Sequence, residues 1–177
     1  MYKHSNFIYK KYQKISKATN LEKELEILVL GEAKPINLIK DTKEYIKYQQ
    51  SIITISSNSW NKESKELFRA ALYKNLAPTL LNSKVEYWAN SMNLKPTKVS
   101  YRKTKRQWGS CSYKNSISLN TFLVMLPSKI IDYIIVHELA HITHKNHSKE
   151  FWALVENYLP EYKDLRKELK IYSPFLN

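Results

Sequence analysis

The sequence predicts an α+β domain, in which short strands and longer helices form separate parts of one core. Short apolar runs bounded by turn residues occupy residues 21–56 and 98–119, as is typical of strands. Apolar residues at helical spacing cover residues 62–92, and a longer apolar segment at residues 130–142 is typical of a buried helix. The 177 residues, 43% of them hydrophobic, are enough for one globular domain with a small appendage.

The N-terminal third of the chain is predicted to differ from the rest. We expect residues 1–60 to form a basic segment followed by a small β-rich portion, and residues 61–177 to form the main domain. Three apolar runs in the first part are strand candidates: Leu25–Leu30, Ile36–Ile39 and Ile52–Ile55. Gly31 is one of only two glycines in the chain and follows the first run directly, so a turn is expected there.

The segment 62–92 is predicted to be helical because its apolar residues recur at intervals of three and four. Pro78 is expected to divide it into two helices, since proline has no amide hydrogen and its ring clashes with the preceding turn. Three short strands should follow Pro96: Lys98–Tyr101, Gln107–Ser112 and Ile117–Leu119. The last two are joined by a hairpin-like turn at Tyr113–Ser116.

A buried helix is expected from about Pro127 to His144. The β-branched run Ile130–Val136 alone would suit a strand, but the apolar pattern continues through Ile142, and this length favours a helix. A final helix should begin at Ser148, a residue type that caps helix N-termini, and resume after Pro160.

Four of the five histidines fall within the buried helix and the residues just after it. The sequence His137-Glu138-Leu139-Ala140-His141 is an H-E-x-x-H motif, which places two imidazoles on one face of a helix, where they can hold one metal ion. The intervening Glu138 can take a proton from a water molecule at that ion. A buried glutamate or histidine is uncommon unless it is paired or metal-bound, so the motif predicts a hydrolytic metalloenzyme that uses Zn²⁺.

The third ligand is expected to be His147. On a straight helix His137 and His144 would be about 10.5 Å apart, whereas zinc–nitrogen bonds are only about 2.1 Å long. The chain must therefore turn first, and Lys145-Asn146 is a suitable place because asparagine tolerates the left-handed conformation that ends helices. The open alternative is a carboxylate from the next helix, namely Glu150, Glu156 or Glu161.

Gly109 lies inside the predicted strand Gln107–Ser112. A glycine within a strand often marks the close approach of a ligand or of another segment. We therefore expect the segment Trp108–Ser112 to lie near the metal site.

The formal net charge of +13 is unevenly distributed. Residues 1–20 and 95–106 are rich in lysine or arginine, contain no acidic residue and carry neighbouring aromatic residues. This combination suits phosphate contact and base stacking, so nucleic acid is a candidate partner. The alternative explanation is a lysine-, asparagine- and isoleucine-rich composition that reflects the base composition of the gene.

Several properties limit where the protein is expected to act. The single Cys111 excludes an internal disulfide, and no apolar run approaches the length of a membrane span. The N-terminus lacks the apolar core of a secretion signal. We therefore expect a cytoplasmic protein without a membrane partner.

Together, four segments resemble the YgjP-like metallopeptidase domain, a relative of the SprT-like zinc peptidases. They are Trp108–Ser112, Ile117–Asn120, His137–His141 and Asn146–Trp152, and the resemblance is specific from about residue 60 to 172. It implies a minimal zincin-like fold with a small mixed or antiparallel sheet, an active-site helix that carries the H-E-x-x-H motif, and a C-terminal helix.

The resemblance also implies the site residues. Zinc would lie on His137, His141 and His147, with Glu138 as the catalytic base. One departure is Gln107, where the family commonly has arginine directly before the tryptophan; Arg106 is the nearest basic residue.

The expected activity is peptide-bond hydrolysis, in which Glu138 transfers a proton from water to the leaving amine. Tyr133, one turn before His137, is a candidate for stabilising the oxyanion. One alternative is a metal-dependent nucleotide or phosphoester hydrolase, although two glycines are too few for a glycine-rich phosphate loop. A second is a non-catalytic, zinc-stabilised nucleic-acid-binding module. A third is a peptidase recruited to nucleic acid.

Overall fold

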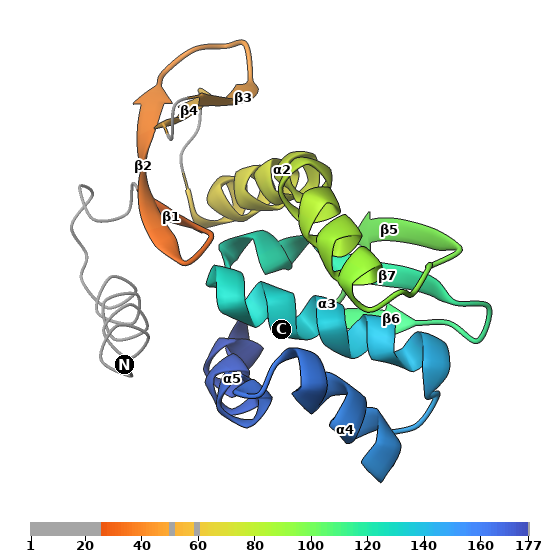
Figure 1. Ribbon diagram of the computed structural model, residues 1–177. Helices are drawn as coiled ribbons and strands as arrows, with labels where there is room; N and C mark the ends of the chain where they lie inside the picture. Colours follow the sequence, from red (N-terminus) through yellow and green to blue (C-terminus); the bar gives the residue numbers. More distant parts are fainter. Residues whose placement is uncertain (1–25, 50–51, 59–60, 177) are drawn as a thin grey trace. The chain divides into compact units, whose positions relative to one another are not determined.

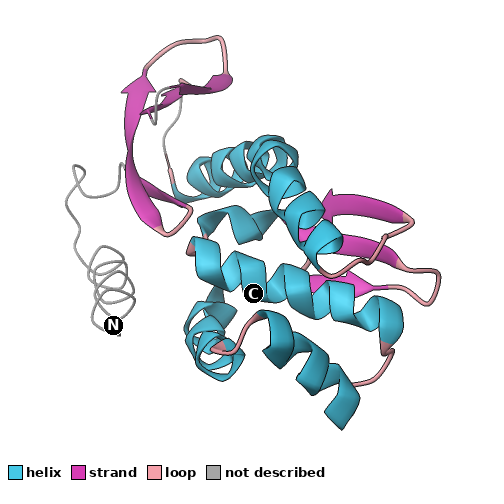
Figure 2. Ribbon diagram, in the orientation of Figure 1, coloured by secondary structure: helices cyan, strands magenta, loops and turns pink. Residues whose placement is uncertain are grey.

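The computed structural model describes residues 26–49, 52–58 and 61–176 and confirms the α+β class (Figures 1 and 2). The described chain divides into two compact units between Leu72 and Tyr73, which we describe separately.

The first unit contains a mixed four-stranded sheet. Its strands are β1 (Glu26–Val29), β2 (Glu32–Ile39), β3 (Tyr45–Gln49) and β4 (Ile52–Ser56), in the order β1-β2-β4-β3. The pairs β1–β2 and β3–β4 are antiparallel, and β2–β4 is parallel. The three strands predicted here are confirmed, and so is the turn, where Gly31 adopts a positive φ of 81°.

Strand β3 was not predicted from the sequence. It lies at the edge of the sheet, and its side chains are only partly buried or exposed. An edge strand of this kind needs no continuous apolar run, so Tyr45–Gln49 lacks the signal by which the other strands are recognised.

Helix α2 (Lys62–Ser91) begins in the first unit and continues into the second as one helix of 30 residues. The predicted division into two helices at Pro78 was therefore wrong. Buried side chains continue at four-residue spacing across the proline: Tyr73, Ala77, Leu81 and Val85. Packing of this continuous stripe offsets the lost backbone hydrogen bond and the steric cost of the proline ring.

The second unit contains a mixed three-stranded sheet made of β5 (Lys98–Arg102), β6 (Gly109–Cys111) and β7 (Ser116–Asn120). Their order is β5-β7-β6, with β5–β7 parallel and β6–β7 antiparallel, so all three predicted strands and the mixed sheet are confirmed. In the β6–β7 turn, Asn115 has a φ of 61° and donates its N–H to the Ser112 carbonyl at 3.0 Å.

A buried 3-10 segment, η2 (Thr121–Met125), connects the sheet to α3 (Ser128–Thr143). Helix α4 (Lys149–Tyr158) starts as predicted at Ser148, whose hydroxyl accepts the N–H of Phe151. Helix α5 (Tyr162–Leu169) and the 3-10 segment η3 (Lys170–Leu176) end the described chain. None of the described helices is long and apolar enough to cross a membrane.

Helix α3 forms the centre of the second unit. It contacts β6, α4 and α5, and Figure 1 shows it running beside the sheet with α4 and α5 next to it. Nine of its residues are buried: Ile130, Ile131, Tyr133, Ile134, Ile135, Val136, Glu138, Leu139 and Ala140. The continuous apolar pattern predicted from the sequence thus follows from packing on several sides.

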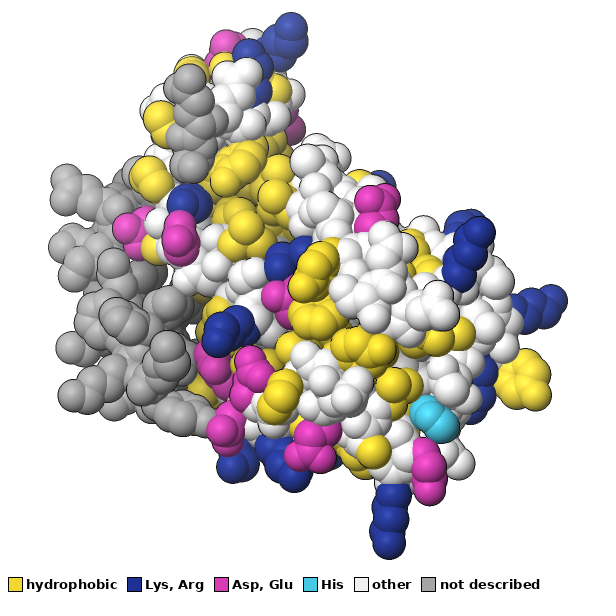
Figure 3. All heavy atoms as spheres, viewed as in Figure 1, with side chains coloured by type: hydrophobic (Ala, Val, Ile, Leu, Met, Phe, Trp, Pro, Cys, Tyr) yellow, Lys and Arg dark blue, Asp and Glu magenta, His cyan; other side chains and the backbone are white. Residues whose placement is uncertain are grey.

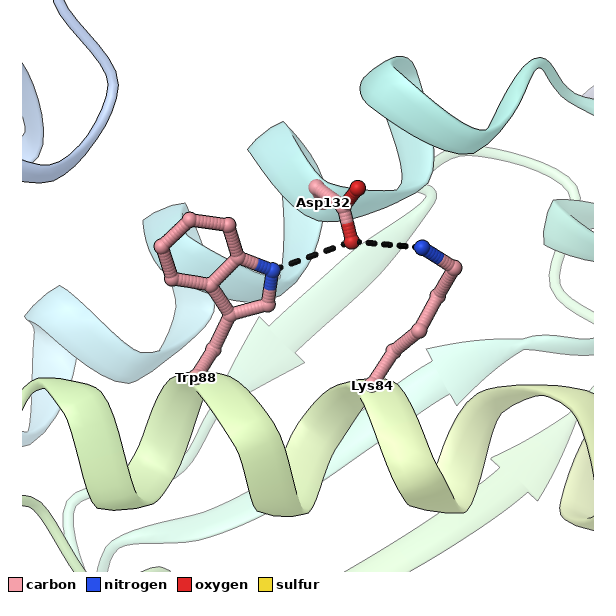
Figure 4. A network of polar contacts seen from close by, with 3 residues as sticks. All are labelled: Lys84, Trp88 and Asp132. Atoms are coloured by element: carbon pink, nitrogen blue, oxygen red, sulfur yellow. Dashed lines mark hydrogen bonds and ion pairs between the residues drawn. The ribbon is translucent and has the colours of Figure 1, made fainter.

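One polar network joins α3 to α2 (Figure 4). The Asp132 carboxylate accepts hydrogen bonds from the Lys84 ammonium at 2.8 Å and from the Trp88 indole N–H at 3.0 Å. Both donors reach the same oxygen, and the Lys84 and Asp132 side chains are mostly shielded from solvent. The shared carboxylate therefore fixes how α3 lies against α2.

We expect Asp132→Ala to lower the free energy of unfolding by about 1–3 kcal/mol, because two partly buried donors lose their acceptor. Asp132→Asn keeps an acceptor oxygen and should cost less. Chemical denaturation measures both variants. Glu156→Ala is the control, since Glu156 forms an exposed ion pair with Lys163 and should change stability little. An Asp132→Ala protein as stable as the control would contradict the role of the network.

Candidate metal centre

The structure brings together the side chains of His137, His141 and His147. One potential ligand atom from each lies within 4.8 Å of the others, and the Nε2 atoms of His137 and His147 are 3.1 Å apart. His137 and His141 are one turn apart on α3, while His147 comes from the loop before α4. Three imidazoles thus converge from two segments.

The end of α3 determines which histidines meet. The helix stops at Thr143, and His144 caps it by donating its backbone N–H to the Ala140 carbonyl at 2.9 Å. The chain then bends at Lys145-Asn146 as predicted, although neither residue adopts the left-handed conformation that was expected there. His147 comes back to the two helical histidines, while His144 does not. The carboxylates considered as alternatives are exposed and lie outside the cluster: Glu150, Glu156 and Glu161.

The hydrogen bonding of His141 leaves one of its nitrogens available. Its Nδ1 lies 2.9 Å from the His144 carbonyl oxygen, which can only accept, so Nδ1 carries the proton. The lone pair of His141 is therefore on Nε2. The His144 backbone, although not its side chain, thus orients one of the clustered imidazoles.

Burial, followed by the nearby His141, His147 and Arg166, lowers the pKa of His137 to about 3. The pKa of His141 is also lowered, chiefly by burial. The Nε2 atoms of His137 and His147 are close enough for the lone pairs of both neutral rings to bind one cation. This donor set fits Zn²⁺, which binds neutral imidazole nitrogen.

Glu138 lies against the backbone of β6 at Gly109. A Cβ atom added to Gly109 would be 2.7 Å from both Cγ and Oε1 of Glu138, so no larger residue fits there without movement. The predicted close approach at Gly109 is confirmed, as is the prediction that this strand lies near the histidines. Burial raises the pKa of Glu138 to about 8, which makes its carboxylate a stronger base than an exposed glutamate.

An aromatic stack supports His147, which is itself exposed. The Trp152 ring is stacked on the imidazole at 5.6 Å with an interplanar angle of 22°, and on Tyr162 at 5.3 Å and 15°. The Arg166 guanidinium lies 4.9 Å from the centre of the Trp152 ring. Trp152 therefore restrains the one clustered histidine that no helix holds.

The sequence did not indicate this role for Trp152. Its position five residues after His147 predicts only that it lies in the first turns of α4. The stack also requires Tyr162 and Arg166 of α5, so it depends on how two helices pack. The sequence had marked Trp152 only as the last residue of the segment Asn146–Trp152 that matches the family pattern.

A pocket of about 330 Å³ opens beside His137 and Glu138. Tyr133 and Trp108 contribute to its lining. Burial raises the pKa of Tyr133 to about 12, so its hydroxyl stays protonated and can serve as a hydrogen-bond donor.

The structure describes only one of the two basic stretches that the sequence shows. Residues 1–20 lie outside the described residues. In the second stretch, Arg102, Lys103, Lys105 and Arg106 are exposed at the end of β5 and in the following loop. On the face drawn in Figure 3, lysine and arginine side chains are scattered among acidic and uncharged ones. Affinity for nucleic acid stays a prediction.

Gly109→Ala should destabilise the protein by about 1–3 kcal/mol, because the new methyl group collides with Glu138. In a Glu138→Ala background the collision is absent, so the same change should cost almost nothing. Chemical denaturation of the four proteins gives the coupling energy, which we expect to be about 1 kcal/mol or more. Ser110→Ala in the same strand is the control and should be insensitive to residue 138. Additive effects of the two substitutions would contradict the proposed contact.

Trp152→Leu should weaken zinc binding about tenfold or more, as outer groups that orient a ligand commonly do. Trp152→Phe keeps a flat ring against His147 and should bind zinc nearly as well as the wild type. Competition with a chromophoric chelator measures affinity, and the visible spectrum of bound Co²⁺ reports changes in ligand geometry. Equal affinities for the leucine and phenylalanine variants would show that the stack does not position His147.

The chain is similar to known proteins in sequence and in structure. The model of the family described as "YgjP-like, metallopeptidase domain" matches residues 1–172. An Escherichia coli (strain K12) protein named UTP pyrophosphatase is 29% identical over 93 residues, which cover 52% of this chain and 53% of that protein. The match therefore spans about half the length of this curated relative.

Two solved structures are similar over about half of the chain. The metallopeptidase zymogen of Pyrococcus abyssi abylysin is 26% identical, with a TM-score of 0.47 over 51% of this chain and 91% of that one. For Methanocaldococcus jannaschii jannalysin, also a metallopeptidase zymogen, the identity is 27% and the TM-score 0.46, over 54% and 96%. Because the family model extends over nearly the whole sequence, this chain belongs to the YgjP-like metallopeptidase domain family.

Proposed function

We propose that this protein is a zinc-dependent hydrolase in which His137, His141 and His147 hold the metal and Glu138 is the general base. The observation that carries this proposal is the convergence of three imidazoles, one of which, His137, lines the same pocket as the buried Glu138. Membership of a metallopeptidase domain family supports a metallohydrolase.

A zinc ion at this site would act as a Lewis acid that promotes ionisation of water and polarises the bond to be cleaved. Glu138 accepts a proton from the attacking water and delivers it to the leaving group. Gly109 leaves the space that the Glu138 side chain occupies beside β6. The Tyr133 hydroxyl, in the same pocket, is a candidate donor to the negative charge that develops on the substrate.

The first candidate substrate is a peptide. In the sheet order β5-β7-β6, strand β6 has a neighbour on one side only, and it lies against Glu138. An extended peptide can pair with such an edge as an additional strand, which would bring its backbone beside the catalytic base. The metallopeptidase family supports this substrate class.

The second candidate substrate is a nucleoside triphosphate. The Escherichia coli relative named UTP pyrophosphatase shows 29% identity to about half of this chain. Both candidate reactions need a water molecule to be deprotonated beside an electrophilic centre, so the same Glu138 would serve either one.

Glu138→Gln should lower turnover by about 10²-fold or more, because the amide cannot accept the proton, while zinc content stays unchanged. The assay compares a peptide library with UTP and other nucleoside triphosphates on the same zinc-loaded sample. Glu150→Gln, an exposed residue outside the cluster, should retain wild-type turnover. Undiminished turnover by Glu138→Gln would contradict the mechanism, and the substrate that is cleaved identifies the class.

A further inference from the structure

The pocket beside Glu138 is unusually rich in positive charge. Arg106, Arg166 and Lys170 contribute cationic side chains to its lining, whereas Glu138 is the only acidic residue that lines it. Within the described part of the chain, none of these three cations forms an ion pair. All three side chains are exposed at the pocket, so water, and not a carboxylate, surrounds their charges.

Two separate parts of the fold supply these cations. Arg166 and Lys170 are four residues apart at the end of α5, which places them on the same side of the chain, and the Trp152 ring supports Arg166. Arg106 belongs to a loop that the buried Asn120 holds in place. The Asn120 amide donates hydrogen bonds to the Thr104 and Gln107 carbonyls at 2.9 and 3.1 Å.

Trp108 also lines the pocket, next to Gly109. Its side chain is only 7% exposed, and its indole N–H is buried without a hydrogen-bond partner among the described residues. Because that N–H is closed to solvent, Trp108 forms a wall of the pocket, and the cations remain the groups that can reach a ligand there.

A purely structural explanation accounts for only part of this arrangement. Arg166 and Lys170 lie at the C-terminal end of α5, where cations interact favourably with the helix dipole. That explanation does not apply to Arg106, which comes from another segment and lines the same pocket. An anionic ligand in the pocket can interact with all three cations.

We propose that Arg106, Arg166 and Lys170 form an oxyanion subsite that binds the phosphate chain of a substrate whose reacting bond lies at Glu138. A phosphate chain fits better than a peptide carboxylate, because three cations exceed what a single negative charge requires. The subsite rests on the proposed hydrolase function and specifies the substrate class of that site.

Inorganic pyrophosphate is the probe, and calorimetry at low ionic strength on the full zinc-loaded chain is the measurement. Arg166→Gln combined with Lys170→Gln should weaken binding about tenfold or more. Lys163→Gln combined with Lys167→Gln removes the same charge from α5 outside the pocket and should have little effect. Equal weakening by both pairs, or no binding to the wild type, would overturn the subsite.

The binding measurement is independent of turnover. Glu138→Gln should lose hydrolysis and still bind pyrophosphate, so failure of the subsite and failure of the hydrolase mechanism give different results. A short peptide with a free C-terminus, compared with its amide, tests the other source of negative charge. Peptide binding that requires the carboxylate and the Arg166–Lys170 pair, without pyrophosphate binding, would overturn the assignment to phosphate.

Discussion

The contact between Glu138 and the backbone at Gly109 is the constraint on which the site depends. Because residue 109 has no side chain, α3 can lie against β6 with the carboxylate buried between them. The same contact places Glu138 in the pocket and leaves His137 and His141 on the neighbouring face of α3. The burial that stabilises α3 against β6 also raises the pKa of Glu138. The packing of the helix and the proton affinity of this carboxylate therefore depend on the same contact.

The remaining part of the site is held by groups outside α3. The His144 carbonyl orients His141, and the Trp152 ring orients His147 through a stack that reaches α5. Arg166 lies on the same tryptophan and also lines the pocket, so one aromatic ring connects the proposed metal ligands to the proposed anion subsite. A change in α5 would consequently affect both.

Local patterns predicted much of this structure, and tertiary packing determined the rest. Histidine spacing and the turn after His144 were enough to predict which imidazoles converge, because both follow from helix geometry. Pro78 was misjudged because a buried stripe keeps α2 continuous, and edge strand β3 lacked a sufficient apolar signal. The cationic pocket could not be predicted, since Arg106 and Arg166 are far apart in sequence and meet only in the fold. The proposed division at residue 60 and the roles of the site residues stay predictions.

X-ray absorption at the zinc edge, together with a crystal structure of the zinc-loaded protein, tests the central claim most directly. The account predicts one zinc ion bound at about 2.1 Å by a nitrogen from each of His137, His141 and His147, with Glu138 nearby but not coordinated. Coordination by His144 or by a carboxylate of α4 in place of His147 would contradict it.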